Sequence, residues 1–198
     1  MAFSPQSRVC YPVHENSEDQ QSKINKEAPD STRMSEAGVE DFQTKTEEET
    51  IYCNIYDTQQ MVWVLAGNSL IAVPASSNVK PVILRMIACR DTEFQDNEKG
   101  NLVFLGIKGK SLCLFCAEIA GTPTLQLKDI DIMTIYKERK AQKDFLFYHS
   151  TEGSTCAFQS VSYPGWFIST PATARQTVTL TQQRGKTTST NFYLESED

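Results

Sequence analysis

Long apolar runs are missing from this sequence of 198 residues. The two longest, residues 61–66 and 112–117, are far shorter than the roughly 18 residues that suggest a membrane span. We therefore expect no membrane insertion. The first eight residues also lack a basic cluster followed by an apolar stretch, so we expect no secretory signal and synthesis in the cytosol.

The residues that catalysis usually needs are equally scarce. Only His14 and His149 are histidines, and neither a Gly-x-Ser-x-Gly motif nor a phosphate-binding glycine loop is present. Acyl transfer requires a nucleophile, a base and an orienting group, and the two neighbours of His149 are Tyr148 and Ser150. The sequence therefore predicts neither an enzyme nor a cofactor site.

Positive charge is not in excess anywhere that would suit nucleic acid. The chain has 25 acidic and 19 basic residues; residues 1–50 hold 11 acidic and 5 basic ones, and the remainder holds 14 of each. A nucleic-acid surface needs a basic face that displaces counterions from phosphate. We expect no nucleic-acid partner.

The same division of composition predicts one folded domain behind a tail. Of the last 148 residues, 65 are apolar, a fraction typical of a chain that buries a core. Residues 1–50 are acidic, rich in serine and without a sustained period, which predicts a disordered segment. Two interpretations stay open for it: a solubilising leader, or a pro-segment that is removed to expose a functional amino terminus.

Six cysteines could form a disulfide framework, but the expected cytosolic synthesis favours free thiols. Cys113 and Cys116 form a C-x-x-C motif, which suits redox chemistry or half of a zinc site. They lie in a strand-like run, however, where residues three apart point to opposite faces. Without a second C-x-x-C, a tetrahedral zinc site would need scattered ligands. We expect these thiols to pack in the core and no metal to be bound.

From residue 51 onward, short β-branched and aromatic runs alternate with Gly, Pro, Asn, Asp and Ser, a pattern typical of strands and turns. This predicts an all-β fold, either a sandwich or a barrel with a cap. A weak internal period of about 45 to 50 residues would suit a threefold barrel. The twelve predicted strands are residues 51–56, 61–66, 69–74, 82–90, 101–107, 111–118, 123–128, 144–149, 154–161, 165–170, 176–182 and 190–195.

Residues 129–143 are the one stretch with helical character. Its apolar half predicts a short turn under a connection. Its basic half, residues 137–143, is either a solvated loop, which we favour, or a heparin-type patch.

Residues 158–170 resemble the signature of the interleukin-1 family, in which Phe, Ser and an aliphatic residue precede Pro and an aromatic-aliphatic-small-Thr run follows. Further stretches between residues 51 and 198 are similar to the interleukin-36 branch. The family's folds are β-trefoils, so the resemblance implies a twelve-stranded trefoil. The signature residues are Phe158, Ser160, Pro164, Phe167, Ile168 and Thr170.

The resemblance implies a pro-inflammatory cytokine. It would be a monomer, leave the cell by an unconventional route and act outside it. It would bind the interleukin-36 receptor and recruit the interleukin-1 receptor accessory protein, which starts NF-κB and MAP kinase signalling. The alternatives are a receptor antagonist of the same branch and, less favoured, a carbohydrate-binding or protease-inhibiting trefoil.

The family also implies an activating protease, because its active amino terminus lies a short distance before an aliphatic-x-Asp motif. Ile55 and Asp57 match that motif. We expect cleavage between Lys45 and Thr46, which would divide the chain into a pro-segment, residues 1–45, and a cytokine domain, residues 46–198.

Receptor contacts are expected on exposed polar loops, because loops vary while the core keeps its packing. Four loops qualify: residues 57–60, 91–100, 137–143 and 183–189. In the last loop a glycine permits backbone conformations and close approach that other residues forbid. The candidate contact residues are Gln59, Asp91, Glu93, Arg184, Gly185 and Lys186.

Overall fold

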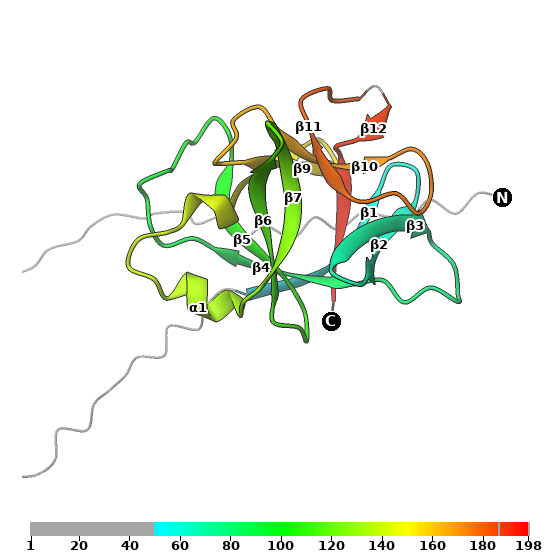
Figure 1. Ribbon diagram of the computed structural model, residues 1–198, viewed down its shortest axis with the longest axis horizontal. Helices are drawn as coiled ribbons and strands as arrows, with labels where there is room; N and C mark the ends of the chain where they lie inside the picture. The colour runs from blue at the N-terminus through cyan, green and yellow to red at the C-terminus, as the bar shows by residue number, and fades with distance from the viewer. Residues whose placement is uncertain (1–49, 186, 198) are drawn as a thin grey trace, which may run out of the picture. The chain divides into compact units, whose positions relative to one another are not determined.

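The computed structural model describes residues 50–185 and 187–197, and the strands within them dominate the fold (Figure 1). Alternation builds them: in the first strand Cys53, Ile55 and Asp57 are buried, whereas Asn54 and Tyr56 are half-buried. The strands are β1 (Thr50–Asp57), β2 (Met61–Ala66), β3 (Ser69–Pro74), β4 (Ile83–Ala88), β5 (Asn101–Ile107), β6 (Leu112–Ile119), β7 (Thr122–Asp129), β8 (Leu146–Glu152), β9 (Thr155–Ser160), β10 (Phe167–Pro171), β11 (Thr179–Thr181), β12 (Thr188–Ser189) and β13 (Phe192–Ser196).

Six of these strands close into a barrel. β1 pairs with β4, β4 with β5, β5 with β8, β8 with β9, β9 with β13, and β13 returns to β1, all antiparallel. The closing pair joins the first and last strands of the described chain, with Ile55 opposite Leu194. Closure leaves no barrel strand with an unpaired edge, and it decides the open choice between sandwich and barrel.

Three hairpins complete the pattern, namely β2–β3, β6–β7 and β10–β11. Each hairpin lies between two barrel strands in the chain, so the fold repeats three times. The repeats begin at Thr50, Asn101 and Thr155, which are 51 and 54 residues apart, slightly more than the period expected from the sequence. The predicted β-trefoil is confirmed.

Two apolar clusters fill the interior. The larger joins all three repeats and includes the fully buried Trp63, Phe158 and Phe192. The smaller lies beneath the helix and includes Phe104 and Leu146. Cys116 belongs to the first cluster and Cys113 to the second, so the prediction that these thiols point to opposite faces and pack in the core is confirmed.

Two elements differ from the sequence prediction. Helix α1 (Ile132–Tyr136) is shorter than the stretch with helical character, and a 3-10 turn, Lys143–Phe145, follows it. β12 is a strand of two residues that pairs Thr170 with Ser189, and it lies inside the predicted 183–189 loop. The loop between β11 and β12 is therefore residues 182–187, hereafter the β11–β12 loop.

The expected pro-segment, residues 1–45, lies outside the described residues, as do Lys45, Thr46 and Lys186. Among the residues that are described, no helix is long and apolar enough to cross a membrane.

Candidate functional site

The carboxylate of Asp57 organises the turn between β1 and β2. Its Oδ1 accepts hydrogen bonds from the backbone N–H of Gln59, at 2.8 Å, and of Met61, at 2.9 Å. Gln60 adopts a φ of 61°, a conformation that costs energy for any residue except glycine. The hydrogen bonds from two backbone donors to one oxygen offset that cost. Asp57, which was expected within an exposed loop, is 1% exposed.

The second oxygen of Asp57 makes a long-range contact. Oδ2 accepts a hydrogen bond from the hydroxyl of Thr170, a residue 113 positions later in the chain that is fully buried in β10. Thr58, the residue after Asp57, is exposed, and its hydroxyl lies 3.2 Å from the Ser189 hydroxyl in β12. The aliphatic-x-Asp motif and the family signature thus meet in space, a contact that their spacing in the sequence does not reveal.

Arg184 holds the β11–β12 loop from its other side. Its Nη2 donates to Glu152 Oε2 at 2.8 Å and its Nε donates to Thr190 Oγ1 at 3.1 Å. The guanidinium also lies 4.2 Å from the centre of the Phe167 ring. The arginine hydrogen bond is the main reason that the pKa of Glu152 is below its ordinary value. Arg184, a candidate receptor contact, is therefore committed largely to shaping its own loop.

Gly185 is the exposed residue that follows this anchor. Its φ is +72°, and a Cβ added to it would meet no atom within 4 Å. The glycine is thus needed here for its backbone conformation, which side chains rarely adopt, and not for close approach to a neighbouring segment. It leaves the loop surface open.

The signature turn connects β9 to β10. The Ser160 hydroxyl accepts from the Tyr163 N–H at 3.1 Å, and Gly165, with a φ of 84°, donates its N–H to the Gln159 side chain at 2.9 Å. Phe158 and Ile168 are fully buried and Pro164 is exposed. Phe167 is half-buried, and the Arg184 guanidinium lies over its ring.

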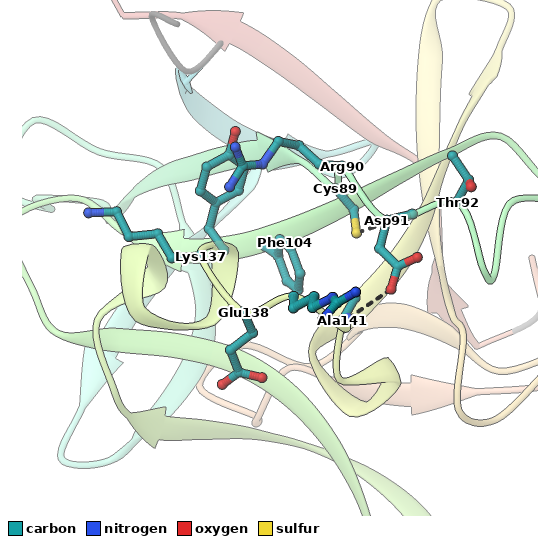
Figure 2. A pocket seen from close by; sticks show the side chains of 10 residues that line it. Cys89, Arg90, Asp91, Thr92, Phe104, Lys137, Glu138 and Ala141 are labelled. Carbon is teal, nitrogen blue, oxygen red and sulfur yellow. Dashed lines mark hydrogen bonds between the residues drawn. The ribbon is translucent and has the colours of Figure 1, made fainter. Parts of the chain in front are cut away.

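A second candidate surface surrounds a cavity of about 380 Å³ beside α1 (Figure 2). Phe104 and Tyr136 line it together with residues 89–92, 137–139 and 141. Asp91 ties the two segments together, because its Oδ2 accepts from the Ala141 N–H and its Oδ1 from the Glu93 N–H, both at 3.0 Å. The bond from Ala141 is the main reason that the pKa of Asp91 is lowered. Asp91 is therefore a structural residue at this rim, and the exposed Glu93 side chain is available to a partner.

The rim of the cavity is polar and carries both acidic and basic side chains. The Arg90 guanidinium lies 4.4 Å from the centre of the Tyr136 ring, and Figure 2 shows the Lys137 and Glu138 side chains extending in different directions. The Cys89 thiol donates to the Asp91 carbonyl at 3.5 Å, and burial raises its pKa. With acidic and basic groups interleaved, this rim does not concentrate charge of one sign, and the basic half of the 129–143 stretch is a solvated loop.

Among residues 50–185 and 187–197, no group of three His, Cys, Asp or Glu side chains could hold a metal ion. Burial lowers the pKa of His149 to about 4, so its imidazole is neutral at physiological pH. It stacks on Phe158 with ring centres 5.1 Å apart.

The candidate residues divide between two surfaces. Gln59 belongs to the β1–β2 turn, which contacts β12 through Thr58 and Ser189, and Arg184 and Gly185 belong to the loop that precedes β12. Asp91 lines the cavity near α1, and Glu93 donates its backbone N–H to Asp91. Sequence reasoning missed the residues that hold the first surface together, Thr58, Glu152 and Ser189. Thr58 and Ser189 lie in loops already singled out, whereas Glu152 had no signal in the sequence.

Comparison with known proteins identifies the fold's relatives. The family model described as Interleukin-1 / 18 matches residues 75–194. Mouse interleukin-36 beta is 71% identical over 143 residues, which covers 72% of this chain and 78% of the relative. Human interleukin-36 alpha is 43% identical over 141 residues, covering 71% of this chain and 89% of the relative.

The chain belongs to the interleukin-1 family. Within that family it is a member of the interleukin-36 branch. The solved NMR structure of the pro-inflammatory cytokine interleukin-36alpha matches with a TM-score of 0.65 and 41% identity, covering 75% of this chain and 94% of that one. Interleukin-1 family proteins are cytokines, so this chain is a cytokine and not an enzyme, and its surfaces serve recognition.

Proposed function

We propose that this protein is an agonist of the interleukin-36 branch. It binds the interleukin-36 receptor, recruits the interleukin-1 receptor accessory protein and thereby starts NF-κB and MAP kinase signalling. The observation that carries the proposal is its high identity to mouse interleukin-36 beta. The protein is made in the cytosol, released by an unconventional route and active as a monomer outside the cell.

The β11–β12 loop is the surface to which we assign recruitment of the accessory protein. Arg184 anchors the loop, and Gly185 gives it a backbone shape with an open surface. We assign first-receptor contacts to Gln59 and Glu93, which are exposed polar residues at the two candidate surfaces. Lys186, which follows Gly185 in the sequence, is part of the same assignment.

A loop variant tests this assignment. Gly185→Val should keep affinity for the first receptor within about threefold and weaken assembly with the accessory protein by tenfold or more. Gly109→Val is the matched control, because Gly109 has a φ of +73° and equally open surroundings in a different turn. Full signalling potency of Gly185→Val in reporter cells carrying both receptor subunits would contradict the assignment.

We further propose that residues 1–45 are a pro-segment, removed by a protease between Lys45 and Thr46. Ile55 is 1% exposed in the barrel core and Asp57 holds the first turn, which supports the use of this motif as the reference point for the cut. Chains beginning at Met1, Phe42, Thr46 and Thr50 should differ in potency, with Thr46 highest. Equal potency of Met1 and Thr46 would overturn the pro-segment proposal.

The same assays separate agonist from antagonist. An antagonist of the branch would bind the first receptor, fail to recruit the second and inhibit a known agonist in the reporter cells. We expect the chain that begins at Thr46 to activate those cells without any added agonist.

A further inference from the structure

The two oxygens of the Asp57 carboxylate accept hydrogen bonds from different parts of the fold. Oδ1 alone satisfies the turn, since it accepts both the Gln59 and the Met61 N–H. Oδ2 accepts the hydroxyl of Thr170. A side chain that only capped its own turn would need one acceptor oxygen, so the bond from Oδ2 to a strand of the third repeat calls for a separate explanation.

Thr170 passes this constraint to the end of the β11–β12 loop. In the β10–β12 ladder Thr170 is opposite Ser189 and Pro171 is opposite Thr188. These two residue pairs are the whole of β12, so the strand is too short to hold its place by its own ladder. The contact between the Thr58 and Ser189 hydroxyls, at 3.2 Å, adds a second tie from the same turn.

The opposite end of the loop is held by Arg184 through Glu152, Thr190 and Phe167. The loop is therefore fixed at two points, by an arginine clamp that starts from β8 and by the β1–β2 turn. Figure 1 shows β12 and its loop beside β10 and β11, on the same side of the view as β1, β2 and β3.

We propose that Asp57 is a positioning residue for the β11–β12 loop. It links the first turn of the cytokine to the recruitment surface, so the aliphatic-x-Asp motif serves assembly with the second receptor as well as marking where the active chain begins. This inference rests on the proposed function of the loop. Asp57 itself is 1% exposed, so it would act through the segments that it bonds.

The test removes the Thr170 hydroxyl and leaves the turn intact. In Thr170→Val the shape of the side chain is nearly kept, while Oδ2 of Asp57 loses its donor. We expect amides of residues 187–190 to exchange hydrogen about tenfold faster, as follows from losing a buried hydrogen bond to a charged group. Affinity for the first receptor should stay within about threefold, and accessory-protein recruitment should fall about tenfold.

Two controls separate positioning from general destabilisation. Thr170→Ser keeps the donor and should behave as the unmodified chain does. Thr124→Val removes a part-buried bond from the Thr124 hydroxyl to the Ala117 carbonyl, at 2.7 Å, together with the bond that the Gln126 amide donates to that hydroxyl, at 3.0 Å, in the β6–β7 hairpin. It should lower the free energy of unfolding without a selective loss of recruitment.

Each outcome decides the proposal. If Thr170→Val leaves both exchange at residues 187–190 and recruitment unchanged, the inference is overturned. If Thr170→Val does not fold, Thr58→Val at the exposed end of the link decides instead: a two- to threefold loss of recruitment supports positioning, and no change overturns it.

The Gly185→Val variant, measured in parallel, separates the assignment of the loop to recruitment from the positioning role of Asp57. If Gly185→Val recruits normally, the assignment of the loop fails, while the exchange data still report whether Asp57 positions it. If Gly185→Val loses recruitment and Thr170→Val does not, only the positioning role fails.

Discussion

The Arg184 guanidinium lies 4.2 Å from the centre of the Phe167 ring. This contact joins a loop that we assign to receptor assembly to a residue of the family signature. It also covers part of the ring of Phe167, an apolar residue that is only half-buried.

The Arg184 clamp predicts the behaviour of a lysine substitution. Arg184→Lys keeps the charge but cannot bond both Glu152 and Thr190 while it covers Phe167. We expect the free energy of unfolding to fall by about 1 kcal/mol and loop amides to exchange faster. Lys99→Gln, which breaks a 3.5 Å surface pair with Asp96, should cost less than about 0.5 kcal/mol. Equal urea midpoints for the two variants would contradict the clamp.

Gly100, at the end of the 91–100 loop, predicts a severe effect of substitution on stability. Its φ is +117°, and an added Cβ would lie 2.3 Å from the carbonyl oxygen of His149. Gly100→Ala should therefore lower the free energy of unfolding by about 3 kcal/mol or more. Gly67→Ala, with a φ of +61° and no atom within 4 Å of the added Cβ, should cost about 1 kcal/mol. Urea denaturation of both variants tests the difference, and similar midpoints would refute it.

His149 predicts a loss of stability in mild acid. Burial lowers its pKa from 6.5 to about 4 in the folded chain, so between these pH values the unfolded chain binds more protons. The free energy of unfolding should fall as the pH drops through that window, by up to about 3 kcal/mol. His149→Gln removes the imidazole and keeps the carboxylates, which titrate in a neighbouring pH range. The pH slope of unfolding should therefore be shallower in the variant, and identical slopes would show that His149 is not responsible.

The cysteines predict a graded reactivity. Cys89 is half-buried, whereas burial raises the pKa to about 11 for Cys53 and to about 12 for Cys113, Cys116 and Cys156. Because the thiolate is the reactive form, we expect iodoacetamide to modify Cys89 at least tenfold faster than these four, as read by peptide mass spectrometry. In urea the five rates should converge. Native labelling of Cys113 at the rate of Cys89 would be incompatible with this packing.

Local patterns in the sequence predicted much of the fold. Short β-branched and aromatic runs bounded by turn residues located the barrel strands within one or two residues at most ends, because such side chains favour the pleated, buried surface of a sheet. The strand period of two separated Cys113 from Cys116 before their clusters were known. Glycine and proline marked the tight turns, since few other residues adopt their backbone angles.

The tertiary structure alone decided how distant segments meet. Three contacts depend on residues far apart in the chain: the pairing of β1 with β13, the hydrogen bond from Thr170 to Asp57, and the stacking of the Arg184 guanidinium on the Phe167 ring. β12 illustrates the reason: its two residues have no pattern of their own and are a strand only because β10 lies beside them. Composition and spacing therefore determined which residues face inward, whereas the threefold closure of the barrel determined which of them touch, because long-range contacts arise only once the chain has folded back on itself.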